Sequence, residues 1–303
     1  MKGTTGGRRF IALAVAGGAL MLAPTALANH PVLVEGNCNN AADPMFSPVP
    51  APGTCGDYDG DQRIGTAEDT DGDRVFGTIN GANGPSGVNN NGTITIVTSG
   101  LFAEQVTLKG NVTLEAAAGV EANVDAVRQG DTSMGAGARQ SQPGVIVDAP
   151  VDRQVVIRNI QSRNWTSGFQ INGVSRVALE GVRAEHNVNY GIEISDKARV
   201  AISDSEIYAT GRRVNPATGD FPTKNKPNPG IGIEFEDDST GSVFFTRVTG
   251  SFGTGVAADG NEVCLALVNL FDNNPDTERG RASFDGGSSN GSCLGSKRSR
   301  SDD

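Results

Sequence analysis

A short glycine-led pattern recurs along the middle of the chain and restricts the folds that it can adopt. Each copy starts with Gly and then alternates apolar residues with others. The five copies start at Gly144, Gly168, Gly191, Gly232 and Gly255. Subtracting these numbers gives intervals of 24, 23, 41 and 23 residues, so the third interval is one repeat with an insertion of about 18 residues. A fixed period of this length is typical of a solenoid, in which each repeat contacts only its neighbours.

Each repeat holds three short segments with strand-like alternation. The second segment is Arg176–Leu179 in one repeat and Arg199–Ile202 in the next. A single repeat cannot bury its apolar face, whereas stacked repeats can. Asn164 and Asn187 precede repeat glycines by four residues, so we expect an internal amide ladder at a bend. A β-sandwich is disfavoured, because its hairpins need turn signals about every 8–12 residues. The sequence predicts an all-β parallel β-helix over residues 91–275.

The opening of this region resembles the first coil of the right-handed parallel β-helix, or pectin-lyase-like, superfamily. In that coil a strand leads to Gly-x-aromatic-x-Glu, here Gly100, Phe102 and Glu104, and then to another strand. The resemblance covers roughly Thr93 to Asn274. It implies a right-handed, single-stranded helix of about seven coils and structural roles for Gly100 and Glu104. The catalytic signatures of pectate lyases, polygalacturonases and pectin methylesterases are missing, so no catalytic residue carries over.

The N-terminus predicts export from the cytosol. Residues 1–28 combine a basic start, a short apolar run and the small-x-small ending Ala26-Leu27-Ala28, which together are typical of a signal peptide. We therefore expect a secreted protein, extracellular or periplasmic, without a membrane span. Removing three basic residues changes the formal charge of −10 to −13, which disfavours binding to nucleic acid.

An exported chain also allows predictions for its cysteines and for its C-terminal residues. Four cysteines predict disulfides, and we favour pairing those that are close in sequence, Cys38 with Cys55 and Cys264 with Cys293. Other pairings and free thiols stay open. Residues 276–295 are expected to cap the helix, residues 296–303 to be disordered, and the protein to be a monomer.

An acidic stretch in the N-terminal segment, residues 29–90, resembles the calcium loops of dockerin or thrombospondin-type repeats. Its carboxylates alternate along a short loop, as a hard cation with about six to eight oxygen ligands requires. The candidate ligands are Asp57, Asp59, Asp61 and Glu68 in a first loop and Asp69, Asp71 and Asp73 in a second. The sequence predicts structural Ca²⁺ here, and the alternative is a solvated acidic linker.

A second candidate site lies on the outward face of the glycine-led strands. Gln170, Glu193 and Glu234 take the same position in successive repeats, so we expect them side by side and facing water, with Glu236 extending the acidic patch. The insertion at 211–230 interrupts the repeat next to them and supplies basic residues. These are Arg212, Arg213, Lys224 and Lys226.

Acidic and basic side chains close together are what a polysaccharide lyase or glycoside hydrolase needs. In that interpretation Glu193, Glu234, Arg212 and Lys224 are catalytic, and the other residues bind substrate. Trp165 and Tyr190 are candidate platforms for sugar rings, although packing over a bend is the commoner fate of such residues. The alternative is a solvated polar face and a surface loop.

Two functions follow. The first is a secreted β-helix that binds extracellular or cell-surface polysaccharide without a proven activity. The second is a lyase or hydrolase acting at Glu193 and Glu234 beneath the insertion. A module of a larger trimeric adhesin is a weaker third possibility.

Overall fold

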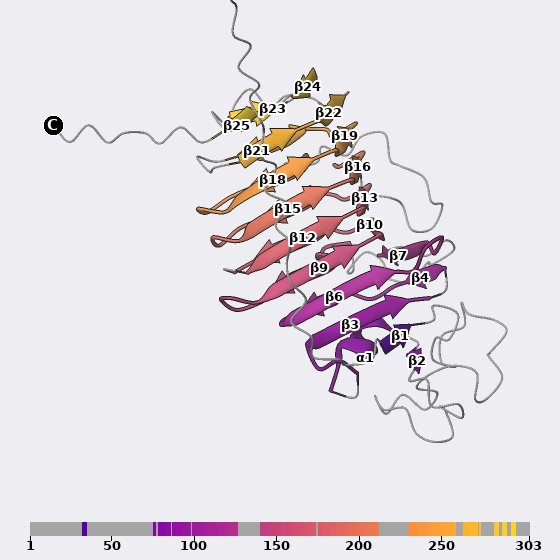
Figure 1. Ribbon diagram of the computed structural model, residues 1–303. Coiled ribbons are helices and arrows are strands. Elements are labelled where there is room, and N and C mark those ends of the chain that lie inside the picture. Colours follow the sequence, from indigo (N-terminus) through magenta and orange to yellow (C-terminus); the bar gives the residue numbers. More distant parts are fainter. Residues whose placement is uncertain are drawn as a thin grey trace, which may run out of the picture.

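The chain forms three long β-sheets that stack along one axis in the computed structural model (Figure 1). The structure describes residues 32–34, 75–76, 78–85, 87–97, 99–126, 140–173, 175–211, 230–258, 263–271, 273, 282–284, 287–289 and 292–294. Almost all of the described elements are strands. The one described helix, α1 (Ile79–Asn83), lies near the N-terminal end. None of the described helical residues forms a segment long and apolar enough to cross a membrane.

The first sheet, called sheet A, faces the viewer in Figure 1. In spatial order its strands are β2 (Val75–Phe76), β1 (Val32–Val34), β3 (Asn91–Ile96), β6 (Asn111–Ala116), β9 (Gln154–Arg158), β12 (Arg176–Glu180), β15 (Arg199–Ser203), β18 (Thr240–Phe244), β21 (Val263–Ala266) and β25 (Ser292–Leu294). All neighbours are parallel except β21 and β25. Strands β1 and β2 show that part of the 29–90 segment continues this sheet.

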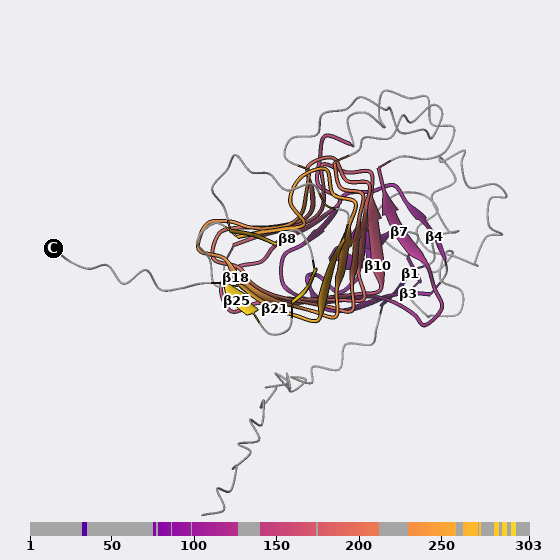
Figure 2. The same cartoon turned by 90° about the horizontal axis from the view of Figure 1, so that it is seen from above.

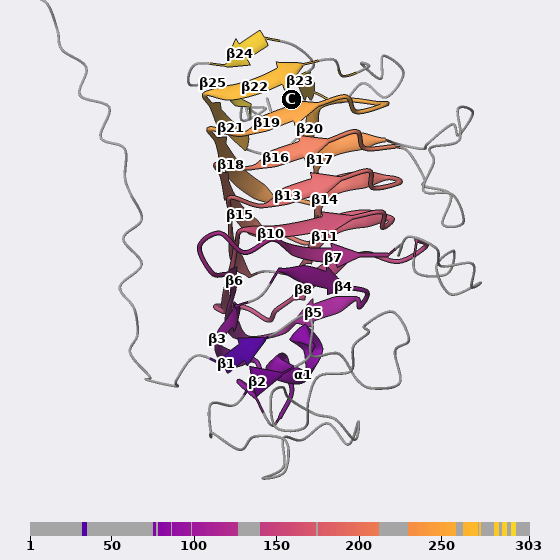
Figure 3. The same ribbon diagram turned by 90° about the vertical axis from the view of Figure 1, so that its right-hand side faces the viewer.

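Sheets B and C complete each coil (Figure 3). Sheet B contains β24 (Gly287–Ser289), β22 (Val268–Phe271), β19 (Arg247–Thr249), β16 (Glu206–Tyr208), β13 (Arg183–Glu185), β10 (Ile160–Arg163), β7 (Ala122–Asp125) and β4 (Gly100–Phe102). Sheet C contains β23 (Ala282–Phe284), β20 (Val256–Ala258), β17 (Ile231–Phe235), β14 (Tyr190–Ile194), β11 (Ser167–Asn172), β8 (Val145–Asp148) and β5 (Val106–Leu108). The chain passes through sheets C, A and B in turn, as a parallel β-helix requires. The predicted all-β parallel β-helix is confirmed.

The core is a set of apolar rows that run along the helix axis. Seen from above, successive coils superpose around one shared interior (Figure 2). Ile171, Ile194 and Phe235 occupy one register position in successive strands of sheet C, and all three are fully buried. The side chains of every strand alternate between the two faces of the sheet. Once the residues that fill the interior are fixed, the residues that face outward are therefore fixed as well.

The bend between sheets A and B uses a residue with positive φ in several described coils. Asn159, Gly181 and Asp204 take this position in three successive coils, and such residues tolerate the left-handed conformation. The next two coils instead carry Phe245 and Leu267, at φ of 46° and 55°. Their side chains are 61% and 51% exposed. Bulky residues are disfavoured in this conformation, so the C-terminal coils hold local backbone strain that earlier coils avoid.

The bend between sheets B and C contains the expected amide ladder. Asn187 is fully buried; its Oδ1 accepts from the amide nitrogen of Trp165 at 3.1 Å, and its Nδ2 donates to the carbonyl of Ser162 at 3.2 Å. Asn164 donates from Nδ2 to Asp125 in the preceding coil at 2.8 Å. All three bonds link one coil to its neighbour, so the structural role predicted for these two residues is confirmed.

Glu104 fixes α1 against the first coils. Its carboxylate accepts from the backbone nitrogens of Ile79 at 2.7 Å and Asn80 at 3.0 Å. Burial raises the pKa of Glu104, although the hydrogen bonds from Asn80 and Ile79 oppose the rise. This carboxylate therefore has the structural role that the resemblance implied.

The C-terminal strands close the other end. Strands β23, β24 and β25 each add antiparallel to the last parallel strand of one sheet. The pairing of β25 with β21 sets Cys293 directly opposite Cys264. Directly opposed residues in such a pair have Cα atoms about 4.5–5.5 Å apart, which is within the range of disulfides.

Candidate functional site

Sheet C carries the polar row that the repeat predicted. Gln170 is in register with Glu193, and Glu193 is in register with Glu234. Glu193 is half-buried. Its Oε2 accepts from Ser167 Oγ at 2.7 Å and from Gln170 Nε2 at 3.2 Å. The expected juxtaposition is therefore present, and Glu193 is held in place by its own sheet.

The expectation that Glu234 faces water is wrong. Its side chain is 0% exposed, although it occupies the outward register position of β17. All five residues of β17 are buried, so both faces of this strand are covered. A sugar bound against Glu193 would not meet the Glu234 carboxylate without a rearrangement. A pair of carboxylates that acts from both sides of one glycosidic bond is therefore not assembled here.

Several other predicted residues lie outside the described residues. This holds for the basic residues of the insertion, Arg212, Arg213, Lys224 and Lys226. It also holds for the expected calcium ligands, Asp57, Asp59, Asp61, Glu68, Asp69, Asp71 and Asp73, and for Cys38 and Cys55. Glu236 is described and half-buried, and its backbone nitrogen donates to the carbonyl of Ile194 at 2.7 Å. Within the described ranges no three His, Cys, Asp or Glu side chains gather as metal ligands would.

One of the two aromatic candidates, Trp165, differs from what a sugar platform needs. Trp165 is 0% exposed, and its indole Nε1 donates to the carbonyl of Val124 at 2.9 Å. It packs inside the bend, so its assignment as a substrate-binding residue is wrong. Tyr190 is half-buried and is in register with Ser167 and Ile231 on sheet C.

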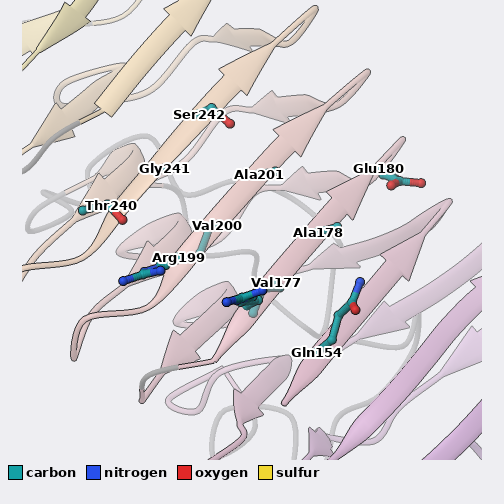
Figure 4. A pocket seen from close by; sticks show the side chains of 11 residues that line it. Gln154, Val177, Ala178, Glu180, Arg199, Val200, Ala201, Thr240, Gly241 and Ser242 are labelled. Atoms are coloured by element: carbon teal, nitrogen blue, oxygen red, sulfur yellow. The ribbon is translucent and has the colours of Figure 1, made fainter. Parts of the chain in front are cut away.

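A groove that the sequence pattern did not predict lies on the outward face of sheet A (Figure 4). Its cavity volume is about 520 Å³. The floor is a row of small side chains at one register position of β12, β15 and β18, namely Ala178, Ala201 and Ser242. In Figure 4, Gln154, Arg199 and Thr240 lie near one end of the strands and Glu180 lies near the other. The groove therefore crosses four coils, with a polar row on one side and Glu180 on the other.

The Glu180 side of the groove is charge-compensated. Arg158 donates from Nε to Glu180 Oε2 at 2.6 Å, and its NH1 lies 3.6 Å from Glu115 Oε2. The hydrogen bond to Glu180 is the largest cause of the raised pKa of Arg158. One guanidinium thus joins carboxylates of the coils before and after it, and this edge offers little free charge to a ligand.

The opposite side carries two arginines without such partners. Arg176 and Arg199 are adjacent in register and both are exposed. Among the described residues, neither forms an ion pair. Neutral side chains continue the row on both sides, with Gln154 before Arg176 and Thr240 after Arg199. The signal in the sequence was an arginine at the same phase of two successive repeats.

Arginines on sheet B behave differently. Arg163 Nε lies 2.5 Å from the buried carboxylate of Asp125, and Arg183 Nε lies 3.4 Å from Glu206. Arg247 NH1 also approaches Glu206, at 3.7 Å. Arg158, Arg163, Arg183 and Arg247 thus each pair with a carboxylate of a neighbouring coil. Arg176 and Arg199 are the other two arginines on the described strands, and neither has such a pair.

Comparison with known proteins gives a match to a family that is described by its fold. Residues 106–274, more than half of the chain, match the family described as the right handed beta helix region. Neither the curated proteins nor the solved structures contain a match. The matched region spans β5 to β22 and includes all of the groove on sheet A. The stacked parallel sheets and this match together show that the chain belongs to the right-handed β-helix family.

Proposed function

We propose that this chain is a secreted, monomeric β-helix protein that binds an extracellular or cell-surface polysaccharide without cleaving it, in the groove on sheet A. The observation that carries the proposal is the continuous floor of Ala178, Ala201 and Ser242 across successive coils. Small side chains let an extended polymer lie close to the sheet. The polar row at one edge and Glu180 at the other supply donors and acceptors for hydroxyl groups.

A lyase or hydrolase at sheet C is the second candidate. The adjacency of Glu193 and Glu234 favours it, because neighbouring strands are about 4.8 Å apart and retaining glycosidases use carboxyl groups about 5–5.5 Å apart. The burial of Glu234 opposes it, since a substrate must reach both groups. Binding without cleavage therefore agrees better with the described residues.

Filling the groove is expected to weaken polysaccharide binding at least tenfold. Ala201 is exposed on the groove floor, so Ala201→Trp places a large ring where the polymer would lie. Strands accept aromatic residues at outward positions, and the fold should therefore persist. The mature protein and the variant would be compared on a glycan array and by calorimetry with the best polymer. We expect the affinity to fall by about tenfold or more, as expected for the loss of about 1.4 kcal/mol of binding free energy.

The matched control is Asn269→Trp. Asn269 is exposed on sheet B, away from the groove, so this variant should bind as the wild type does. Equal binding by both tryptophan variants and the wild type would overturn the proposal. So would new unsaturated uronates or reducing ends when the wild type is incubated with its polymer, because either product would make the protein an enzyme.

Calcium is proposed for the acidic loops of the N-terminal segment. Closely spaced carboxylates such as Asp57, Asp59 and Asp61 repel one another unless a cation neutralises them. We expect EDTA to lower the melting temperature and to speed proteolysis between residues 57 and 73, with added Ca²⁺ restoring both. Mg²⁺ at the same concentration is the control, because it prefers fewer and more rigid ligands. Unchanged melting and cleavage after chelation would exclude a structural calcium there.

Disulfides are proposed because a secreted protein folds in an oxidising environment. The register opposition of Cys264 and Cys293 supports their pairing, which would fasten β25 to the last parallel strand of sheet A. The pairing of Cys38 with Cys55 rests on their closeness in sequence.

A further inference from the structure

We propose that the groove on sheet A takes an acidic polysaccharide, whose carboxylate or sulfate groups bind the guanidinium groups of Arg176 and Arg199. This inference rests on the proposed function and adds the chemical class of the ligand. Sheet A and sheet C are different faces of the helix, so the site is separate from the carboxylate row of Glu193 and Glu234.

The spacing of the two arginines suits a polymer with repeated anionic groups. Arg176 and Arg199 are direct register partners on β12 and β15, so their Cα atoms are one strand spacing, about 4.8 Å, apart. A guanidinium presents a planar fork of donors that matches a carboxylate or a sulfate with two hydrogen bonds. Two such forks side by side can bind two neighbouring anionic groups of one chain, or both can bind a single group.

The charges around the pair favour an anionic ligand. Like charges directly opposite each other on a sheet destabilise it, and an anion bound between them removes that repulsion. The carboxylates on the other edge of the groove, Glu115 and Glu180, already contact Arg158. The turns next to the arginines carry exposed Asp196, Lys197, Asp237 and Asp238. Among the described residues, no ion pair joins any of these carboxylates to Arg176 or Arg199.

The residues beside the pair limit where the charge of the ligand can lie. Gln154 and Thr240 are the register neighbours of the two arginines, and both are neutral hydrogen-bonding side chains. The floor next to the arginines is Ala178 and Ala201, which leaves room for a sugar ring at van der Waals distance. The site is therefore a central cationic pair with neutral polar ends, in a protein whose formal net charge is −10.

The test compares neutral and anionic forms of the same polymer. Polygalacturonate and its carboxyl-reduced form probe carboxylates, and dextran sulfate and dextran probe sulfates. We expect the wild type to bind at least one anionic member and to bind its neutral partner at least tenfold more weakly. Arg176→Gln with Arg199→Gln should weaken anionic binding about a hundredfold, or about tenfold for each guanidinium that no longer binds an anionic group. Lysines at both positions should restore part of it, because the charge returns without the fork.

The control variant is Lys109→Gln with Arg247→Gln, which removes two positive charges outside the groove. Its affinity should stay within about twofold of the wild-type affinity, because salt screens charges that are distant from the ligand. Equal weakening by both double variants would overturn the inference, because net charge alone would then explain binding. The proposal of an anionic ligand would be overturned if neutral polymers bound well, if Ala201→Trp weakened that binding and if the arginine variant did not change it. The groove would then remain the binding site. Binding that neither Ala201→Trp nor the arginine variant changes would overturn both proposals.

Discussion

Replacing Gly191 with valine is expected to lower the free energy of unfolding by about 3 kcal/mol or more, which is a large part of the stability of a typical domain. Gly191 lies in β14, where the coil is tightly packed against the next one. A Cβ atom at this position would lie 2.5 Å from the carbonyl oxygen of Gly232 and 2.5 Å from Ile207 Cγ2. A backbone oxygen cannot move aside as the end of a side chain can, so the coils would have to separate.

The same steric restriction recurs along the stack. A Cβ atom on Gly168 would meet the carbonyl oxygen of Gly191 at 2.7 Å, and one on Gly232 would meet that of Gly255 at 2.5 Å. The glycine at a fixed phase of the repeat is thus explained by steric exclusion between neighbouring coils. Urea denaturation followed through the fluorescence of Trp165, the only tryptophan of the chain, would measure the effect.

Ala201→Val is the control for added volume. Ala201 is exposed on an outward face, so the same β-branched side chain has room there and should change the stability by less than about 0.5 kcal/mol. A Gly191→Val protein that unfolds at the same urea concentration as the wild type would show that the coils are not packed as described.

Patterns that recur in every coil could be predicted from the sequence. The phase of the glycines and the alternation of apolar residues fix the register, and the register places Gln170, Glu193 and Glu234 in one row. This works because side chains on a strand have only two directions and neighbouring coils are copies of each other. The fold and the polar row on sheet C therefore followed from the repeat alone.

Properties set by atoms outside the repeat could not be predicted in this way. Glu193 and Glu234 occupy equivalent positions, yet the first is half-buried and the second fully buried, because every residue of β17 is covered. Arg158 and Arg176 also differ in their partners, since Arg158 ends β9 and Arg176 begins β12. Arg158 pairs with a carboxylate 22 residues away, on the next coil, and Arg176 pairs with none among the described residues. The register places Arg158 beside Glu180 and Arg176 beside Gln154, and the side-chain contacts show which of the two arginines is paired.

Replacing Asn187 with alanine is expected to cost about 3 kcal/mol of unfolding free energy. The side chain satisfies two backbone groups of the preceding coil, the amide nitrogen of Trp165 and the carbonyl oxygen of Ser162. Asn187 and Ser162 are fully buried, so water cannot readily replace the missing bonds, and each unsatisfied group costs about 1–3 kcal/mol. Asn273 makes the same two hydrogen bonds at the same sequence offsets, to Ser251 and Val248. The arrangement therefore recurs in another coil and is not specific to Asn187.

Amide hydrogen exchange at Trp165 would report the Asn187→Ala change directly, because the N–H of that residue loses its acceptor. We expect faster exchange at Trp165 and a red-shifted fluorescence emission, since its indole lies in the loosened bend. Asn269→Ala on the exposed face of sheet B is the matched control and should leave both signals unchanged. If Asn187→Ala kept the wild-type stability and the exchange rate of Trp165, the internal amide would not hold the coils together. The stacking of the coils would then depend on their strand pairing and apolar core alone.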